Sequence, residues 1–304
     1  YLRNDKLDAN DFFANRESRG KVPFRQNQYG ISAGGPVVLP KLYNGRDRTF
    51  WFANWEGFRS RRGSTAIATF PVAEQRNGDF SQQPRNIYDP LTSQAGPGGA
   101  ITRQPFAGNR IPASRIHPAS RYILDTIIPL PNRAGLANNS VNTEPNQSNR
   151  DIWVMRADHV LTSKDNLSFR YLNQKVSVLS PNANQYYYSE SAFDAQNAAA
   201  SWNRVLSSSS VIEFRFGYHE PFVPIITKNR KVSRADFLKN TGIRLFQADT
   251  PFQTIPVVTV TGEFNASASG VASGDHVYQY AATYSKIAGR HSLKAGLTYS
   301  RRQY

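Results

Sequence analysis

The chain has 304 residues, no cysteine and a net charge of +15. The lack of cysteine excludes disulfides, thiol catalysis and cysteine-ligated metals, and no apolar run approaches the roughly 18 residues of a membrane-spanning helix. The positive charge suggests an anionic partner, but the basic residues are dispersed and not concentrated on one element, so we do not expect nucleic acid as a partner.

The chain begins at Tyr1, not at methionine, and has no basic-plus-apolar leader. Its first three residues resemble the end of a strand. We therefore expect a fragment or a processed product of a longer protein.

The first periodic segment predicts two long strands, residues 26–39 and 49–59, joined by a turn at 40–48. Residues two apart lie on the same face of a strand. This gives one small, polar face and one aromatic face, the latter with Trp51 and Trp55 in the second strand. Three phenylalanines blur the polar side: Phe50, Phe52 and Phe58.

The two-residue period returns after residue 150. It predicts strands at 151–161, 167–174, 197–206, 212–219, 276–286 and 293–301. Short turns near 44, 164, 208 and 289 alternate with long connections at 63–150, 175–196 and 220–275. Short helices are predicted inside the long connections at 71–77, 117–127 and 233–239.

This alternation of short turns and long loops between long strands is typical of outer-membrane barrels. A strand of about 10 residues, tilted by about 40°, crosses roughly 25 Å of membrane. The predicted fold class is all-β, an antiparallel transmembrane β-barrel with short periplasmic turns and long extracellular loops that carry short helices. With about nine strands, we expect the barrel to be incomplete, with two unpaired edges. The predicted location is the outer membrane, in contact with lipid and lipopolysaccharide.

Three arginines lie on the polar faces of their strands, which a barrel turns toward its lumen: Arg156, Arg170 and Arg215. They are candidates to contact plug carboxylates or to line an anionic path, although ordinary lumen solvation and pairing with Asp158 or Glu213 is the simpler explanation. The aromatic residues predicted to face lipid or to form interfacial girdles are Trp51, Trp55, Trp153, Phe214, Phe216, Tyr218, Tyr278, Tyr280 and Tyr284.

We find no sequence signature of catalysis. The five histidines show neither a metal-ligand spacing nor a plausible serine and aspartate set, and there is no phosphate-binding glycine loop. Residues 4–11 contain an oxygen-rich cluster that could hold Ca²⁺, but it lacks the order of an EF-hand, and a loop bonded to itself is the simpler interpretation. We predict no enzymatic activity, no cofactor and no metal.

Several motifs of the first 171 residues follow the order found in one family. They are YLRNDKLDANDFF (1–13), PFRQNQYGISAGGPV (23–37), RTFWFANWEGFR (48–59), FPVAEQRNGDFS (70–81), IYDPLT (87–92), PFAGNRIPASRIHPAS (105–120), PLPN (129–132) and RADHVLTSKDNLSFRY (156–171). The sequence resembles the barrel region of Oar-like TonB-dependent receptors, the carboxypeptidase-regulatory-like outer-membrane proteins of Acidobacteria and related bacteria.

This resemblance implies a barrel of about 22 strands, an upstream plug domain and an N-terminal segment that contacts TonB, neither of which is in this chain. It further implies active uptake of a bulky extracellular solute whose identity the sequence does not reveal. The alternatives are a structural or adhesive outer-membrane barrel without transport and, third, a soluble basic β-protein that binds polyanions.

Overall fold

The computed structural model describes residues 1–10, 12–16, 21–243, 255, 258–260, 264–266 and 270–303. Asp11 of the predicted Ca²⁺ loop, the terminal Tyr304 and part of the predicted 220–275 loop lie outside the described residues.

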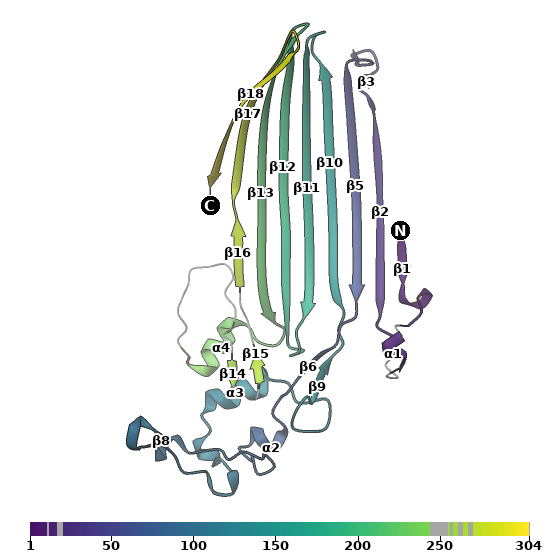
Figure 1. Cartoon of the computed structure of the whole chain (residues 1–304). Helices are drawn as coiled ribbons and strands as arrows, with labels where there is room; N and C mark the ends of the chain where they lie inside the picture. Colours follow the sequence, from purple (N-terminus) through teal and green to yellow (C-terminus); the bar gives the residue numbers. More distant parts are fainter. Residues whose placement is uncertain are drawn as a thin grey trace.

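One large antiparallel sheet forms the body of the molecule (Figure 1). Its strands are β1 (Leu2–Asn4), β2 (Phe24–Pro36), β5 (Thr49–Arg62), β10 (Asn146–Val160), β11 (Asp165–Pro181), β12 (Tyr187–Ser207), β13 (Ser210–Asn229), β16 (Gly270–Gly274), β17 (His276–Ala288) and β18 (His291–Gln303). Each strand of the path β1-β2-β5-β10-β11-β12-β13-β17-β18 pairs with its neighbour in chain order, and β16 pairs with the far end of β13. This is the up-and-down meander expected of a barrel wall.

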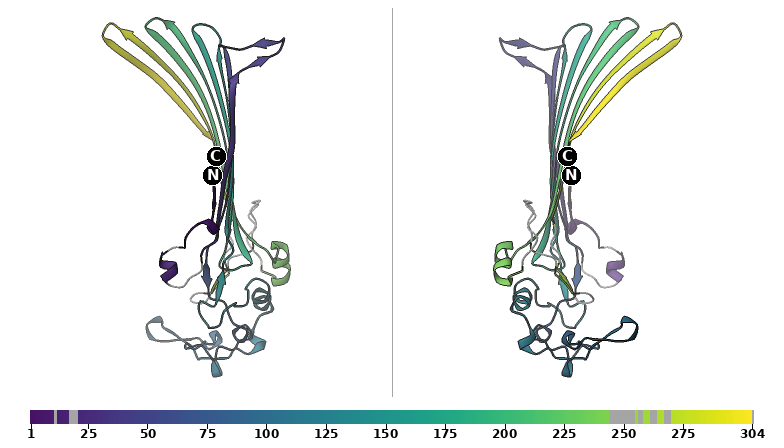
Figure 2. Two further views of the ribbon diagram at one scale, coloured as in Figure 1. Left: turned by 90° about the vertical axis from the view of Figure 1, so that its right-hand side faces the viewer. Right: turned by 90° about the vertical axis from the view of Figure 1, so that its left-hand side faces the viewer.

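The sheet is open. Among the described residues, β1 pairs with β2 alone and β18 with β17 alone, so the first and last strands do not close a circle. Edge-on views show the strands splaying apart at the turn end, as strong twist requires (Figure 2). The prediction of an antiparallel barrel wall with two unpaired edges is therefore confirmed.

Tight turns cluster at one end of the sheet, which we call the turn end (Figure 1). They connect β10 to β11, β12 to β13 and β17 to β18. In the first, the Thr162 hydroxyl donates to Asp165 Oδ2 at 2.6 Å and accepts from the Lys164 and Asp165 amides. In the last, Gly289 takes a φ of 60°, which glycine adopts without strain. Between β2 and β5 the chain inserts a small hairpin of β3 (Val38–Leu39) and β4 (Tyr43–Asn44).

We call the opposite end of the sheet the loop end. The structure there shows that the prediction of a loop at 175–196 is wrong. Residues 175–196 are not a loop, because β11 continues to Pro181 and β12 begins at Tyr187, which leaves only 182–186 as the connection. The register is continuous throughout this part, from Lys175↔Asp194 to Pro181↔Tyr188. Likewise β10 begins at Asn146, inside the predicted 63–150 loop, and β13 extends to Asn229. The strands run past the predicted membrane segment, where polar and apolar residues are mixed on both faces and the alternation is lost.

The remaining loop-end chain folds into short elements. They are α1 (Phe12–Arg16), α2 (Ala73–Arg76), α3 (Pro118–Thr126), α4 (Arg234–Thr241) and the strand pairs β6 (Ala66–Ala68) with β9 (Ser140–Asn142), β7 (Gln94–Ala95) with β8 (Ile101–Thr102), and β14 (Val258–Val260) with β15 (Phe264–Ala266). Single 3₁₀ turns lie at Asp5–Leu7, Pro90–Thr92, Pro97–Gly99, Ala107–Asn109 and Ala113–Arg115. The three helices predicted inside the long connections are confirmed as α2, α3 and α4. In the part of the chain that the structure describes, none of the helices has the length and apolar character needed to cross a membrane.

We call residues 63–145, 182–186 and 230–243, together with Ile255, the loop unit. It has a hydrophobic core built from distant segments, with every member at most 3% exposed: Phe70, Ile127, Ile128, Tyr187, Phe237 and Ile255. Tyr187 is the first residue of β12, so the core joins the loop unit to the sheet. Helices α3 and α4 contact each other, and α4 contributes Phe237 to the core.

Buried polar side chains fix the loop unit. Arg76 is 7% exposed, and its guanidinium donates to the carbonyls of Pro71, Leu124, Ile128 and Pro129, which ties α2 to the end of α3. Burial lowers the pKa of this guanidinium from its ordinary value. Asn139 exchanges two hydrogen bonds of 2.8 Å with the backbone of Phe70. These contacts satisfy loop backbone groups that would otherwise be buried without partners.

Candidate functional site

The strand register divides the sheet into two faces of opposite character. Directly opposed residues of neighbouring strands lie on the same face, so the partners of any residue can be followed across the sheet. Trp51, for example, opposes Ala157 on β10, and the row continues through Phe169, Ala200, Phe216 and Tyr280. The same procedure places all nine aromatic residues predicted to face lipid on one face, which we call the aromatic face.

Cross-strand ring contacts cover this aromatic face. Ring centroids lie 5.7 Å apart for Trp55 and Trp153, and 5.1 Å apart for Tyr218 and Tyr278. The face also carries apolar residues that were not singled out from the sequence: Phe169, Tyr171, Trp202, Leu297 and Tyr299. Their two-residue spacing could have identified them, because each belongs to the alternating set of its strand.

The aromatic face is apolar over only part of each strand, and we call this part the apolar band. On β13 it runs from Ile212 to Tyr218, seven residues, or about 20 Å along the strand. Toward the loop end the next position on the face is Glu220 on β13, Asp151 on β10 and Gly57 on β5. Arg59, one position further along β5, pairs with Asp151 at N–O distances of 2.8 and 2.9 Å. Because charged pairs are too costly to face hydrocarbon, the band ends there.

Polar contacts bound the band at the turn end as well. The indole of Trp202 donates to Asp165 Oδ1 at 3.0 Å, and the Thr49 hydroxyl lies 2.7 Å from His159 Nδ1. Tryptophan and tyrosine at both limits, with polar groups beyond them, match the aromatic girdles of a membrane barrel.

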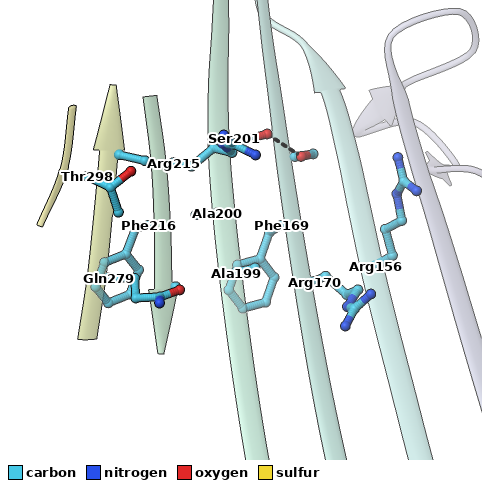
Figure 3. A pocket seen from close by; sticks show the side chains of 13 residues that line it. Arg156, Phe169, Arg170, Ala199, Ala200, Ser201, Arg215, Phe216, Gln279 and Thr298 are labelled. Carbon is cyan, nitrogen blue, oxygen red and sulfur yellow. Dashed lines mark hydrogen bonds between the residues drawn. The ribbon is translucent and has the colours of Figure 1, made fainter. Parts of the chain in front are cut away.

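The other side of the sheet, the polar face, carries the three predicted lumen arginines (Figure 3). They line one concave region of about 500 Å³ together with Ser168, Ser201, Gln279 and Thr298. Arg156 directly opposes Arg170. Arg156 is bonded to Asp158 at 2.7 and 2.9 Å, and Arg215 lies 3.6 Å from Glu213. All three side chains are exposed, and Arg170 differs from the other two in having no hydrogen bond or ion pair within the described chain.

The three phenylalanines that blurred the polar face do lie on it. Phe58 is covered by Arg150, whose guanidinium carbon is 5.3 Å from the ring centroid and which also pairs with Glu56. Phe50 and Phe52 remain 40% and 42% exposed beside Arg156 and Arg170. These two rings form a small exposed apolar patch on the polar face, near the turn end.

The histidines serve local structure. His117 caps α3 by accepting from the Ala119 amide, and His276 Nδ1 lies 3.0 Å from the Tyr218 hydroxyl. In the predicted Ca²⁺ loop, Asn4 accepts from the Lys6 amide and Asp8 pairs with Arg3. Within the described ranges, no three histidine, aspartate or glutamate side chains come together as metal ligands.

Comparison with known families agrees with this geometry. The family model for the outer membrane beta barrel domain matches residues 1–304. The chain therefore belongs to the outer membrane beta barrel family, and its location is the outer membrane. No curated protein matches the sequence. The family excludes the third alternative, a soluble basic β-protein.

Membership assigns the two faces and the two ends. Barrels of the outer membrane turn apolar residues to lipid and polar residues to the lumen, with short turns in the periplasm and long loops outside. This rule predicts that the aromatic face contacts lipid, that the polar face lines the lumen and that the loop unit lies outside the cell.

Proposed function

We propose that this chain is part of a TonB-dependent receptor that takes up a bulky solute across the outer membrane. The observation that carries the proposal is the size and order of its loop-end structure. Strands β11 to β13 continue well past the apolar band, and the loop unit above them folds around its own core. No enzymatic step is part of this proposal.

A folded loop unit favours solute capture for a physical reason. Loops that are ordered before binding lose less conformational entropy when the solute binds, so affinity can be high from a dilute medium. The core residues and the buried Arg76 supply this order. A loop-side hollow of about 360 Å³, lined by Arg121, Asp125, Tyr186 and Leu130 among others, offers charged, aromatic and apolar contacts to such a solute.

The lumen wall adds a preference for negative charge. Arg170 has no partner among the described residues and opposes Arg156, so an anionic group of a plug domain or of the passing solute would relieve their repulsion. Charge reversal of Arg156, Arg170 and Arg215 together is expected to impair plug retention or uptake in the full-length protein. Unchanged retention and uptake would remove this role of the three arginines.

Uptake is tested in the native bacterium by deleting the gene and supplying fluorescein-labelled oligosaccharides and peptides. We expect the deletion strain to lose accumulation of one probe class. The same loss is expected when the wild type is treated with a protonophore and when TonB is deleted. If every probe accumulates equally in both strains while attachment to surfaces is lost, the structural or adhesive alternative replaces transport.

A further inference from the structure

We propose that three arginines of the aromatic face, Arg25, Arg59 and Arg61, form a binding site for the phosphate groups of lipopolysaccharide in the outer leaflet. We call them the arginine cluster. The proposal rests on the outer-membrane location of the barrel and is independent of whether the protein transports a solute.

The cluster lies at the height of lipid headgroups. Trp55, Gly57, Arg59 and Arg61 follow one another on the same face of β5, and Trp55 with Trp153 marks the loop-end limit of the apolar band. Arg59 is four residues beyond Trp55, which is about 10 Å along the membrane normal for a tilted strand. Arginine side chains reach back toward the interface from such positions. The loop end is the outer side, so the leaflet concerned is the one that contains lipopolysaccharide.

The cluster has positive charge that the protein does not neutralise. Arg25 directly opposes Arg61 in the register of β2 and β5, and like charges in that position destabilise a sheet. Arg61 donates to two neutral oxygens, Asn149 Oδ1 and the Ser60 carbonyl, each at 2.8 Å. The exposed side chain of Arg25 forms no hydrogen bond or ion pair with the residues that the structure describes. Within the part of the chain that the structure describes, Arg59 alone of the cluster has a carboxylate partner, Asp151.

Two aromatic rings in contact, Tyr29 and Trp55, lie beside these charges. The guanidinium carbon of Arg59 is 5.8 Å from the ring centroid of Tyr29, and that ring meets Trp55 edge-on at 5.5 Å. Gly57 makes the arrangement possible, because a Cβ at this position would lie 2.5 Å from the Tyr29 ring. The site therefore offers guanidinium forks, which match phosphate oxygens in pairs, directly beyond rings that contact acyl chains or sugar faces.

These features select a lipid over other anions. A soluble acidic protein or polysaccharide could satisfy the charges, but it would have to approach along a face that continues without a break into the apolar band. A phosphorylated glycolipid already lies there, with its acyl chains against the band and its phosphates at the height of Arg25 and Arg61.

The test uses the full chain in detergent and measures affinity for bisphosphorylated lipid A and for the same lipid after phosphatase treatment. Replacing Arg25 and Arg61 by glutamine is expected to weaken lipid A binding about thirtyfold, on the order of fivefold per arginine. The phosphatase-treated lipid should bind the wild type as weakly as lipid A binds the double variant.

The matched control is Arg62→Gln. Arg62 follows Arg61 on β5 but lies on the polar face, opposite Phe24 and Asn146, so this variant should bind like the wild type. A second variant, Arg25→Lys with Arg61→Lys, keeps the charge but loses the guanidinium forks. Its affinity for lipid A should lie between those of the wild type and the double glutamine variant. The β-sheet signal in circular dichroism reports folding of each variant. Equal affinity of wild type and double variant, equal weakening by Arg62→Gln, or equal binding of the phosphatase-treated lipid would each overturn the proposal.

Discussion

The membrane part of the sheet and the loop unit bury their residues in opposite ways. In the sheet, large apolar side chains such as Trp51, Phe214 and Leu297 are 40–75% exposed. In the loop unit, Phe70, Ile127 and Phe237 are 0–1% exposed within a core. The aromatic face of the sheet is not covered by the described chain and needs an apolar environment such as lipid, whereas the loop unit excludes water by packing on itself.

The comparison also explains the polar composition of a membrane protein. Only the apolar band needs to satisfy lipid, while the polar face, the strand extensions and the surface of the loop unit remain in water. The mean hydropathy of −0.54 is therefore an average over one apolar band and several regions that face water. The two regions should therefore respond differently to substitution, and four changes test this.

The largest effect is expected from Phe237→Ala. Removing a fully buried ring should destabilise the loop unit by about 3–5 kcal/mol because it leaves a cavity. Hydrogen exchange should show lost protection in α3 and α4, with unchanged protection of the β10–β13 band. The control Leu91→Ala, at a side chain 78% exposed in the same unit, should leave exchange unaltered. Loss of protection in both regions would mean that they unfold as one.

Next in size is a pair of adjacent substitutions on β17. Ala282 lies on the aromatic face between Phe214 and Leu297, and Thr283 lies on the polar face opposite Glu213. Ala282→Arg should destabilise the barrel by about 2–4 kcal/mol because it places a charge in lipid. Thr283→Arg should be near neutral because it meets a carboxylate. Urea midpoints in lipid vesicles measure both, and equal midpoints would contradict the assignment of the faces.

A smaller effect is expected on the lumen wall. Arg170→Glu converts the like-charge pair with Arg156 into an opposite-charge pair and should stabilise the sheet by about 0.2–1 kcal/mol. Arg170→Gln removes the repulsion without adding attraction and should give part of that gain. Urea midpoints again provide the measurement. A loss of stability in both variants would mean that Arg170 has a partner in the assembled barrel.

The smallest effect is a pH dependence confined to the loop unit. Hydrogen bonds from Ser81, and then the charge and hydrogen bond of Arg110, lower the pKa of the Asp79 carboxyl from 3.8 to about 2. A depressed pKa in the folded state contributes stability above pH 3.8 that is lost as the pH falls toward about 2. Limited proteolysis of the loop unit should therefore accelerate over that interval, less steeply in Asp79→Asn. An identical profile in the variant would assign the effect to other groups.

Local chemistry in the sequence was sufficient for much of the fold. The two-residue period located the strands. It also placed Trp153, Tyr218 and Tyr278 in the apolar alternating set of their own strands, because side-chain direction in a strand is a property of the backbone alone. The tight turns were found for the same reason, since Thr162 to Asp165 and Gly289 act within a few residues. Family-like motifs and loop alternation then predicted an outer-membrane barrel.

Only the tertiary structure decided how far the strands extend and what they bring together. Residues 175–181 and 187–196 form strands because neighbouring strands supply their hydrogen-bond partners, although outside lipid nothing forces one face to be apolar. The opposition of Arg156 to Arg170, and of Arg25 to Arg61, depends on register between strands and cannot be read from either strand alone. The core likewise unites Phe70 with Tyr187, 117 positions later in the chain, and with Phe237, a further 50 positions on, because burial is settled by packing and not by local pattern.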